Sequence, residues 1–163
     1  MFEVGAILVA GVLATAAAVW GVVSQRSIAR CRATIEFIAR SEADGDLIQA
    51  RRAFIQLAKA PSGLAVWAAE DKEQTEQAQA IKLVLNEFEL ISIGIQGGII
   101  DFELYKRWHR QGTLAYWRNA LPFIAALRDR TGNAALFHEF EEMVGWMKEE
   151  KLPRRSWKER RWW

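Results

Sequence analysis

Cysteine, histidine and proline are scarce in this chain, whose 163 residues include one cysteine, two histidines and three prolines. The lone Cys31 has no partner for an internal disulfide, which excludes a disulfide framework and makes a reducing cytoplasm the simpler setting. His138 and Glu142 share a helix face four residues apart, but no third ligand joins them, so we expect a solvated face there. We therefore expect no metal and no cofactor.

Motifs that mark catalytic sites are also missing. The chain contains no Gly-x-x-x-x-Gly-Lys phosphate loop and no Gly-x-Ser-x-Gly nucleophile elbow. The glycine-rich stretch 94–98 follows a predicted helix rather than a strand, which indicates a helix stop. We therefore expect that the protein is not an enzyme.

Charge is absent from residues 4–23, which are apolar throughout except for one threonine. Twenty residues at the helical rise span roughly 30 Å, the thickness of a bilayer's hydrocarbon core. Only Glu3 carries charge before the run, whereas Arg26, Arg30 and Arg32 follow it. Because Lys and Arg next to a span stay in the cytoplasm, we expect the amino terminus outside a bacterial inner membrane and the rest inside.

Residues 1–25 are therefore predicted to form a single-pass transmembrane anchor, with Trp20, Arg26 and Arg30 at the membrane interface. The competing interpretation is a cleaved secretory signal with its cleavage site at the alanines 16–18. No basic residue precedes the run, and the run reaches full spanning length. Both features favour the anchor.

Small residues recur on one face of this predicted span: Ala10, Gly11, Ala14 and Ala18. Such a stripe lets two transmembrane helices approach closely. Alanine is also common in spans for other reasons, so self-association through this face and a span without a partner both stay open.

Residues 26–150 are long enough for one domain with its own core. They are rich in Ala, Leu, Ile, Glu, Gln and Arg, and they show little strand-like alternation. The predicted fold class is therefore all-α, a single N-terminal transmembrane helix followed by a cytoplasmic multi-helix bundle.

The helices of this bundle can be placed from apolar spacing and from turn residues. The first is expected to continue from the span to about residue 40, and the central, most buried one to cover 72–96. Asp101 is expected to cap the next helix, which should end at Gly112-Thr113. Two more segments are predicted at 114–130, with Pro122 as a kink or a new start, and at 134–150.

The stretch from Leu85 to Asp101 reads Leu-Asn-Glu-Phe-Glu-Leu-Ile-Ser-Ile-Gly-Ile-Gln-Gly-Gly-Ile-Ile-Asp. The chain also has a short outer end, a single predicted span and then a helical domain. Together, this stretch and this layout resemble a bacterial and phage family of small membrane-anchored proteins, domain of unknown function 4760. Trp117 and the Leu127-Arg128 pair are also similar to that pattern. The resemblance implies a helical domain and frequent association with phage or mobile elements, and it implies no established activity.

A candidate polar cluster lies in or near that stretch: Asn86, Glu89, Asp101 and Arg128. Asn86 and Glu89 are three residues apart and share a helix face. Burying Glu89 without a partner would be costly, so Arg107, Arg118 or Arg128 is the expected partner. The cluster is either a binding notch or an ion pair that fixes helix packing, with Asp101 as a plain cap, and packing is the favoured interpretation.

Residues 151–163 form a basic tail that carries +5, although the whole chain carries only +2. The candidate interface residues of this tail are Arg154, Arg155, Trp157, Arg160, Arg161, Trp162 and Trp163. Basic and tryptophan side chains suit an anionic lipid surface, and they also suit nucleic acid. No folded basic surface supports nucleic-acid binding, so membrane lipid is favoured, and a merely solubilising end stays open.

The function predicted from these features is a membrane-anchored helical interaction module that contacts membrane lipids and binds a protein partner. In the phage or prophage setting that the resemblance implies, it would act on a host membrane process, such as exclusion of a competing phage or modulation of a host complex. Two alternatives stay open. One is an unrecognised enzyme or effector that uses Glu89, Asp101 and Arg128, and the other is a homo-oligomeric membrane assembly.

Overall fold

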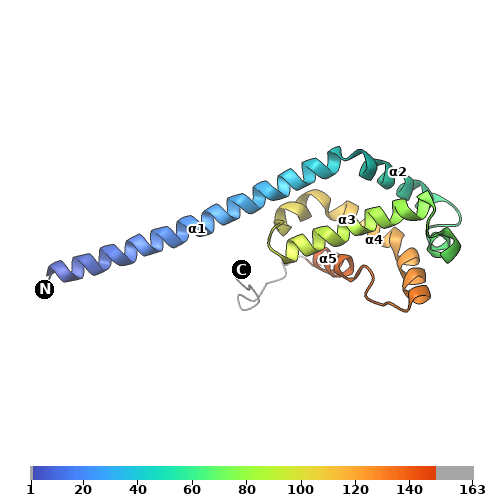
Figure 1. Ribbon diagram of the computed structural model, residues 1–163. Helices are drawn as coiled ribbons and strands as arrows, with labels where there is room; N and C mark the ends of the chain where they lie inside the picture. The colour runs from blue at the N-terminus through green and yellow to red at the C-terminus, as the bar shows by residue number, and fades with distance from the viewer. Residues whose placement is uncertain (1, 150–163) are drawn as a thin grey trace.

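The computed structural model describes the backbone of residues 2–149 and the side chains of residues 10–149. Within that part of the chain the fold is all-α, as predicted, and no strand occurs. The helices are α1 (Phe2–Ala43), α2 (Gly45–Lys59), α3 (Glu76–Gln96), α4 (Phe102–Thr131) and α5 (His138–Lys148), with short 3₁₀ turns η1 (Ala65–Ala68) and η2 (Glu70–Lys72) between α2 and α3. Figure 1 shows α1 extending well beyond a bundle that the other helices form.

Helix α1 is one unbroken helix of 42 residues. The part from Ala10 onward is long and apolar enough to cross a membrane, and none of its most apolar window is buried in the protein. Val12 and Trp20, for example, are 69% and 75% exposed. A core helix would bury such side chains, so this surface is available to an apolar environment outside the described structure.

Side-chain caps begin three of the helices. Asp44 accepts a hydrogen bond from the Leu47 amide at 3.0 Å, and Thr75 accepts one from the Ala78 amide at 3.3 Å. Asp101 caps α4 in the same way, as its position in the sequence predicted. Each cap satisfies a donor that the first helical turn would otherwise leave unpaired.

Three predicted boundaries are wrong. Helix α4 runs through Gly112-Thr113 and through Pro122 without a break, because glycine is tolerated inside a helix that is held by tertiary packing. Helix α3 begins at Glu76 rather than at residue 72, since Thr75 provides the cap. Helix α5 begins at His138 rather than at residue 134, because Phe137 has a left-handed backbone with φ of +58° that interrupts the helix.

Helix α3 is the central helix of the bundle, as predicted. Its buried positions are Ala78, Ile81, Val84, Leu85, Phe88, Ile91, Ser92, Gly94 and Ile95. Phe88 stacks on Phe140 of α5 with ring centroids 4.5 Å apart, and Trp117 of α4 meets Phe140 edge-on at 5.1 Å. This aromatic cluster joins three helices and contributes to the core beyond its buried area alone.

The second half of α1 is joined to the bundle by Phe37 and Ile38, which pack against the core, and by polar groups. The buried Thr34 donates to the Arg30 carbonyl at 2.8 Å and accepts from the Asp101 amide at 2.7 Å. Arg30 Nε also lies 3.4 Å from Asp101 Oδ2, an ion pair without the geometry of a hydrogen bond. The same residue, Asp101, therefore caps α4 and holds α1 against it.

We expect Thr34→Val to lower the free energy of unfolding of the bundle by about 1–3 kcal/mol, because the isosteric valine leaves the Asp101 amide without its acceptor. Thermal unfolding of the detergent-solubilised protein, followed by circular dichroism, measures the change. Thr15→Val is the matched control, since the Thr15 hydroxyl bonds only to the Gly11 carbonyl of its own helix. Equal melting temperatures for the two variants would contradict the role given to Thr34.

Candidate functional site

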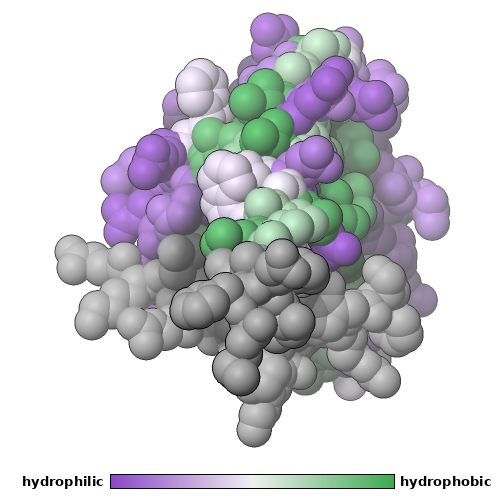
Figure 2. All heavy atoms as spheres, turned by 90° about the vertical axis from the view of Figure 1, so that its left-hand side faces the viewer, coloured by the Kyte–Doolittle hydropathy of each residue, from purple (hydrophilic) through white to green (hydrophobic). Residues whose placement is uncertain are grey.

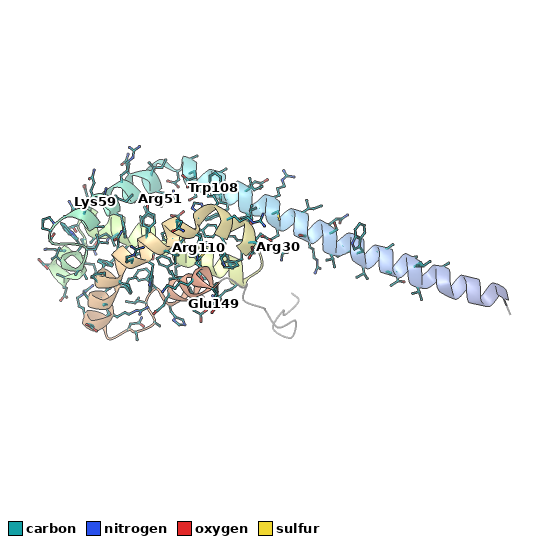
Figure 3. The ribbon with its side chains drawn as sticks, turned by 180° about the vertical axis from the view of Figure 1, so that it is seen from behind. Arg30, Arg51, Lys59, Trp108, Arg110 and Glu149 are labelled. Carbon is teal, nitrogen blue, oxygen red and sulfur yellow. The ribbon has the colours of Figure 1, made fainter. Side chains whose placement is uncertain are left out.

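A pocket of about 270 Å³ lies where the end of α1 meets α2, α3 and α4. Its walls are formed by Phe37, Ile38, Ser41 and Glu42 of α1, Arg51 of α2, Glu87, Phe88 and Ile91 of α3, and Tyr105, His109, Gly112, Thr113 and Tyr116 of α4. Figure 3 labels Arg51, and it labels Trp108 and Arg110, the sequence neighbours of His109, at this end of the domain. The pocket thus combines ionic, hydroxyl and aromatic side chains from four helices.

One wall of the pocket is a closed network of charged hydrogen bonds centred on Arg51. Arg51 Nη2 donates to Glu87 Oε1 and to Ser41 Oγ, both at 2.7 Å, and Arg51 Nε reaches Glu87 Oε2 at 3.3 Å. Ser41 also donates to Glu87. Glu42, at 3.3 Å from Arg51 Nη1, is the outermost member, with half of its side chain exposed. Three helices are joined by this network.

The opposite wall is one face of α4, on which Tyr105, His109, Thr113 and Tyr116 follow one another at helical spacing. Tyr105 stacks on His109 with centroids 4.8 Å apart, and Tyr116 packs against aromatic rings of α2 and α3. Thr113 Oγ1 is buried and, within the described residues, makes no hydrogen bond of standard geometry. Its side-chain partner is the Tyr105 hydroxyl: burial raises the pKa of that phenol, and the interaction with Thr113 lowers it in part.

Burial favours the neutral forms of the titratable groups of the α4 wall. It lowers the pKa of His109, which Arg51 lowers further and Glu42 partly restores. It raises the pKa of Tyr105 and of Tyr116. Burial alone would lower the pKa of Arg51, but its partner Glu87 outweighs that effect and raises it. With one guanidinium against two carboxylates, the pocket has a formal net charge of −1.

The structure does not bring the four residues of the predicted polar cluster together. Glu89 accepts a hydrogen bond from the Phe140 amide at 2.7 Å, so its partner is the first turn of α5 rather than an arginine. Burial raises the pKa of Glu89, although the backbone amides lower it in part. Because Phe137 provides no side-chain cap, Glu89 serves as the cap of α5 from a neighbouring helix.

The other three members of that cluster are dispersed. Asp101 lies at the junction of α1 and α4. Arg128 donates to the Leu136 carbonyl and to Glu141, both at 2.9 Å, and thereby holds the connection between α4 and α5. Asn86 is exposed on the outer face of α3. No pocket is formed by these residues as a group.

The predicted membrane-facing residues lie along α1 or outside the described residues. Trp20 and Arg26 are exposed on α1, while Arg30 is paired with Asp101. The small residues Ala10, Gly11, Ala14 and Ala18 are exposed on the same helix. All candidate residues of the tail lie outside the described residues. Among residues 10–149 no group of three or more His, Cys, Asp or Glu side chains could hold a metal ion, and the His138–Glu142 pair, at 3.5 Å, is solvent-exposed.

Sequence reasoning missed the pocket. The spacing of Tyr105, His109, Thr113 and Tyr116 on one predicted helix was the available signal, and the expected helix boundary at Gly112-Thr113 divided it. The pairing of Arg51 with Glu87 links residues 36 positions apart on two different helices. Nothing in the apolar spacing of those helices specifies such a contact.

The fold and the pocket define an all-α protein in which one long apolar helix is fused to a compact bundle with an ionic and aromatic pocket at the junction. A protein-family profile matches residues 7–146, nearly the whole described chain. The chain belongs to the family described as Domain of unknown function (DUF4760), as the resemblance in residues 85–101 indicated. Searches of curated proteins and of solved structures found no match.

We expect Arg51→Met to destabilise the bundle by about 3 kcal/mol, because it leaves the Glu87 carboxylate buried without its counter-charge. Adding Glu87→Leu should restore most of that loss, since an apolar pair of similar volume replaces the ion pair. Melting temperatures of the two single variants and the double variant, combined in a double-mutant cycle, measure the coupling. Additive losses would contradict the pairing.

Proposed function

We propose that this protein is a single-pass membrane protein that presents its helical bundle in the cytoplasm to a protein partner. The amino terminus lies outside the bacterial inner membrane and residues after the span lie inside, in keeping with the arginines that follow the apolar run. The exposed, apolar first half of α1 supports the anchor. The polar joint at Thr34 and Asp101 supports a bundle that is held firmly next to it.

The observation that carries partner binding is an apolar stripe on the outer face of α3, which Asn86 interrupts. Leu83, Leu90 and Ile93 are 43%, 60% and 52% exposed, and Ile99, in the turn that follows, is 65% exposed. The opposite face of the same helix is buried in the core, so α3 is apolar on two sides. Exposed apolar residues grouped in this way favour a protein interface over a merely solvated surface.

Figure 2 shows hydrophobic and hydrophilic side chains next to one another on the face from which α1 extends. A phage or prophage setting, which the resemblance to the family implies, would make the partner a component of a host membrane process. The dispersal of Glu89, Asp101 and Arg128 removes the reason for an enzyme built on those residues. Protein binding is therefore the function we propose.

The double variant Leu90→Lys/Ile93→Lys should lose a partner that the natural protein retains, because charge on the stripe prevents apolar burial. Crosslinking in native membranes followed by mass spectrometry identifies the partner. Leu121→Lys, which places the same charge at an exposed apolar position of α4, is the matched control and should retain it. Identical partner sets for both variants would contradict the interface on α3.

The same membranes test the anchor independently. All variants should remain in the membrane fraction after alkaline extraction, and an epitope added at the amino terminus should be cleaved by protease outside intact spheroplasts. Release of the protein into the aqueous fraction would contradict the anchor without affecting the test of the stripe.

A homo-oligomer is the second candidate, and the free face of α1 favours it. Ala14, Gly21, Ile28 and Ile35 recur every seven residues on the side of α1 away from the bundle. Ile28 and Ile35 are 65% and 57% exposed, and Cys31 lies between them along a shallow groove. A seven-residue apolar repeat is typical of two helices that coil around each other, and copies inserted in one orientation would pair in parallel.

Such pairing predicts a disulfide between the Cys31 residues of two copies upon mild oxidation in membranes, since facing positions bring their Cα atoms within the range that a disulfide requires. Non-reducing gel electrophoresis detects the covalent dimer. In the Cys31→Ser background, a cysteine introduced at Ala29, which is exposed but off this face, should give little dimer. Equal dimer yields from the two positions would indicate random collision and contradict the pairing.

A further inference from the structure

The two walls of the pocket differ in how well their polar groups are paired. Arg51 and Glu87 direct their donors and acceptors at each other and at Ser41. On the α4 wall, Tyr105 and Thr113 interact with each other, while His109 and Tyr116 interact with the charges of the opposite wall without a hydrogen bond to them among the described residues. A buried hydroxyl such as that of Thr113 is costly to leave unpaired. The α4 wall is therefore the side from which a ligand would be held.

The net charge of the pocket determines which sign of charge a ligand must carry. An anion would have to displace Glu87 from Arg51, because most of the guanidinium donors are already engaged. A cation meets Glu42, whose half-exposed carboxylate accepts one hydrogen bond within residues 10–149, from Arg51 at 3.3 Å, and so keeps free acceptor positions. The hydroxyl groups of the α4 wall, and the imidazole of His109 in its neutral form, can accept hydrogen bonds as well.

The size of the pocket restricts the ligand to a small molecule. A volume of about 270 Å³ lies just below the usual range of ligand sites, so a molecule of drug size would not fit. Phe37, Phe88 and Tyr116 supply aromatic walls that can enclose an apolar part of the ligand. Gly112 leaves the α4 side open, since a Cβ atom built on it has nothing within 4 Å.

We propose that this pocket binds a small organic cation, an ammonium or guanidinium group on a short apolar or aromatic body. Glu42 is its counter-charge, the hydroxyl groups and the imidazole of the α4 wall accept its hydrogen bonds, and the aromatic side chains enclose its body. This binding site is separate from the apolar stripe on α3. The test of cation binding is therefore independent of the test of the protein partner.

Benzylammonium is the probe that tests this proposal, with benzoate and benzyl alcohol as anionic and neutral molecules of matched shape. For the full-length protein in detergent, benzylammonium should raise the melting temperature in a concentration-dependent manner, and isothermal titration should give saturable binding. The two matched molecules should produce neither effect. Equal effects of benzoate or benzyl alcohol, or no effect of benzylammonium, would overturn the proposal.

Gly112→Leu should abolish binding by filling the pocket. Leucine is a better helix former than glycine, and the position of its Cβ atom is open, so we expect this variant to be about as stable as the natural protein. Gly145→Leu is the matched control, because Gly145 lies in α5, also with open space around it, and binding should persist. Glu42→Gln should weaken binding about tenfold, equivalent to about 1.4 kcal/mol. Unchanged binding by Gly112→Leu would overturn the assignment of the pocket.

Discussion

The junction between α1 and the bundle combines apolar packing of Phe37 and Ile38 with polar contacts at Arg30, Thr34 and Ser41, which recur along one side of the helix. That side faces α4 and the pocket, while apolar residues on the other side of α1 are left exposed. A helix with both properties belongs to two environments at once, the bundle and whatever surrounds its exposed half. Hydrogen bonds have defined directions, so these contacts fix the rotation of α1 about its axis more sharply than apolar packing would. The orientation of the bundle relative to the apolar helix follows from them.

Much of the fold could be predicted from the sequence because its signals are local. Three such signals depend on neighbouring residues only: the apolar run, the cap at Asp101 and the high proportion of apolar residues in 83–95. The prediction failed where tertiary contacts override local preference. Gly112 reads as a break, yet the packing of the flanking residues Tyr105 and Trp117 in the core keeps α4 continuous across it. Phe137 has no local signal for a left-handed backbone, and the burial of its side chain accompanies that conformation.

The site could not be predicted in the same way. Glu89 was recognised as a carboxylate that must find a partner inside an apolar helix, and that physical argument holds. Its partner, however, is a backbone amide of α5, which no pattern of charged residues can reveal. Glu87, two positions away, points toward α1 and α2 and forms the ion pair of the pocket instead. Two acidic residues two positions apart on one helix thus act in two separate joints, because helical positions i and i+2 point in different directions.

Because α1 is unbroken, it also sets the distance between the pocket and the end of the apolar run. Ser41 lies 18 residues beyond Val23, where the apolar run ends, and at the helical rise this is about 27 Å along the axis. For a chain held in a bilayer by that run, the distance exceeds the reach of a lipid surface potential, which decays over about 8 Å at physiological salt. The pocket would then sample solutes at their concentration in bulk cytosol, and anionic headgroups would not enrich them at its entrance.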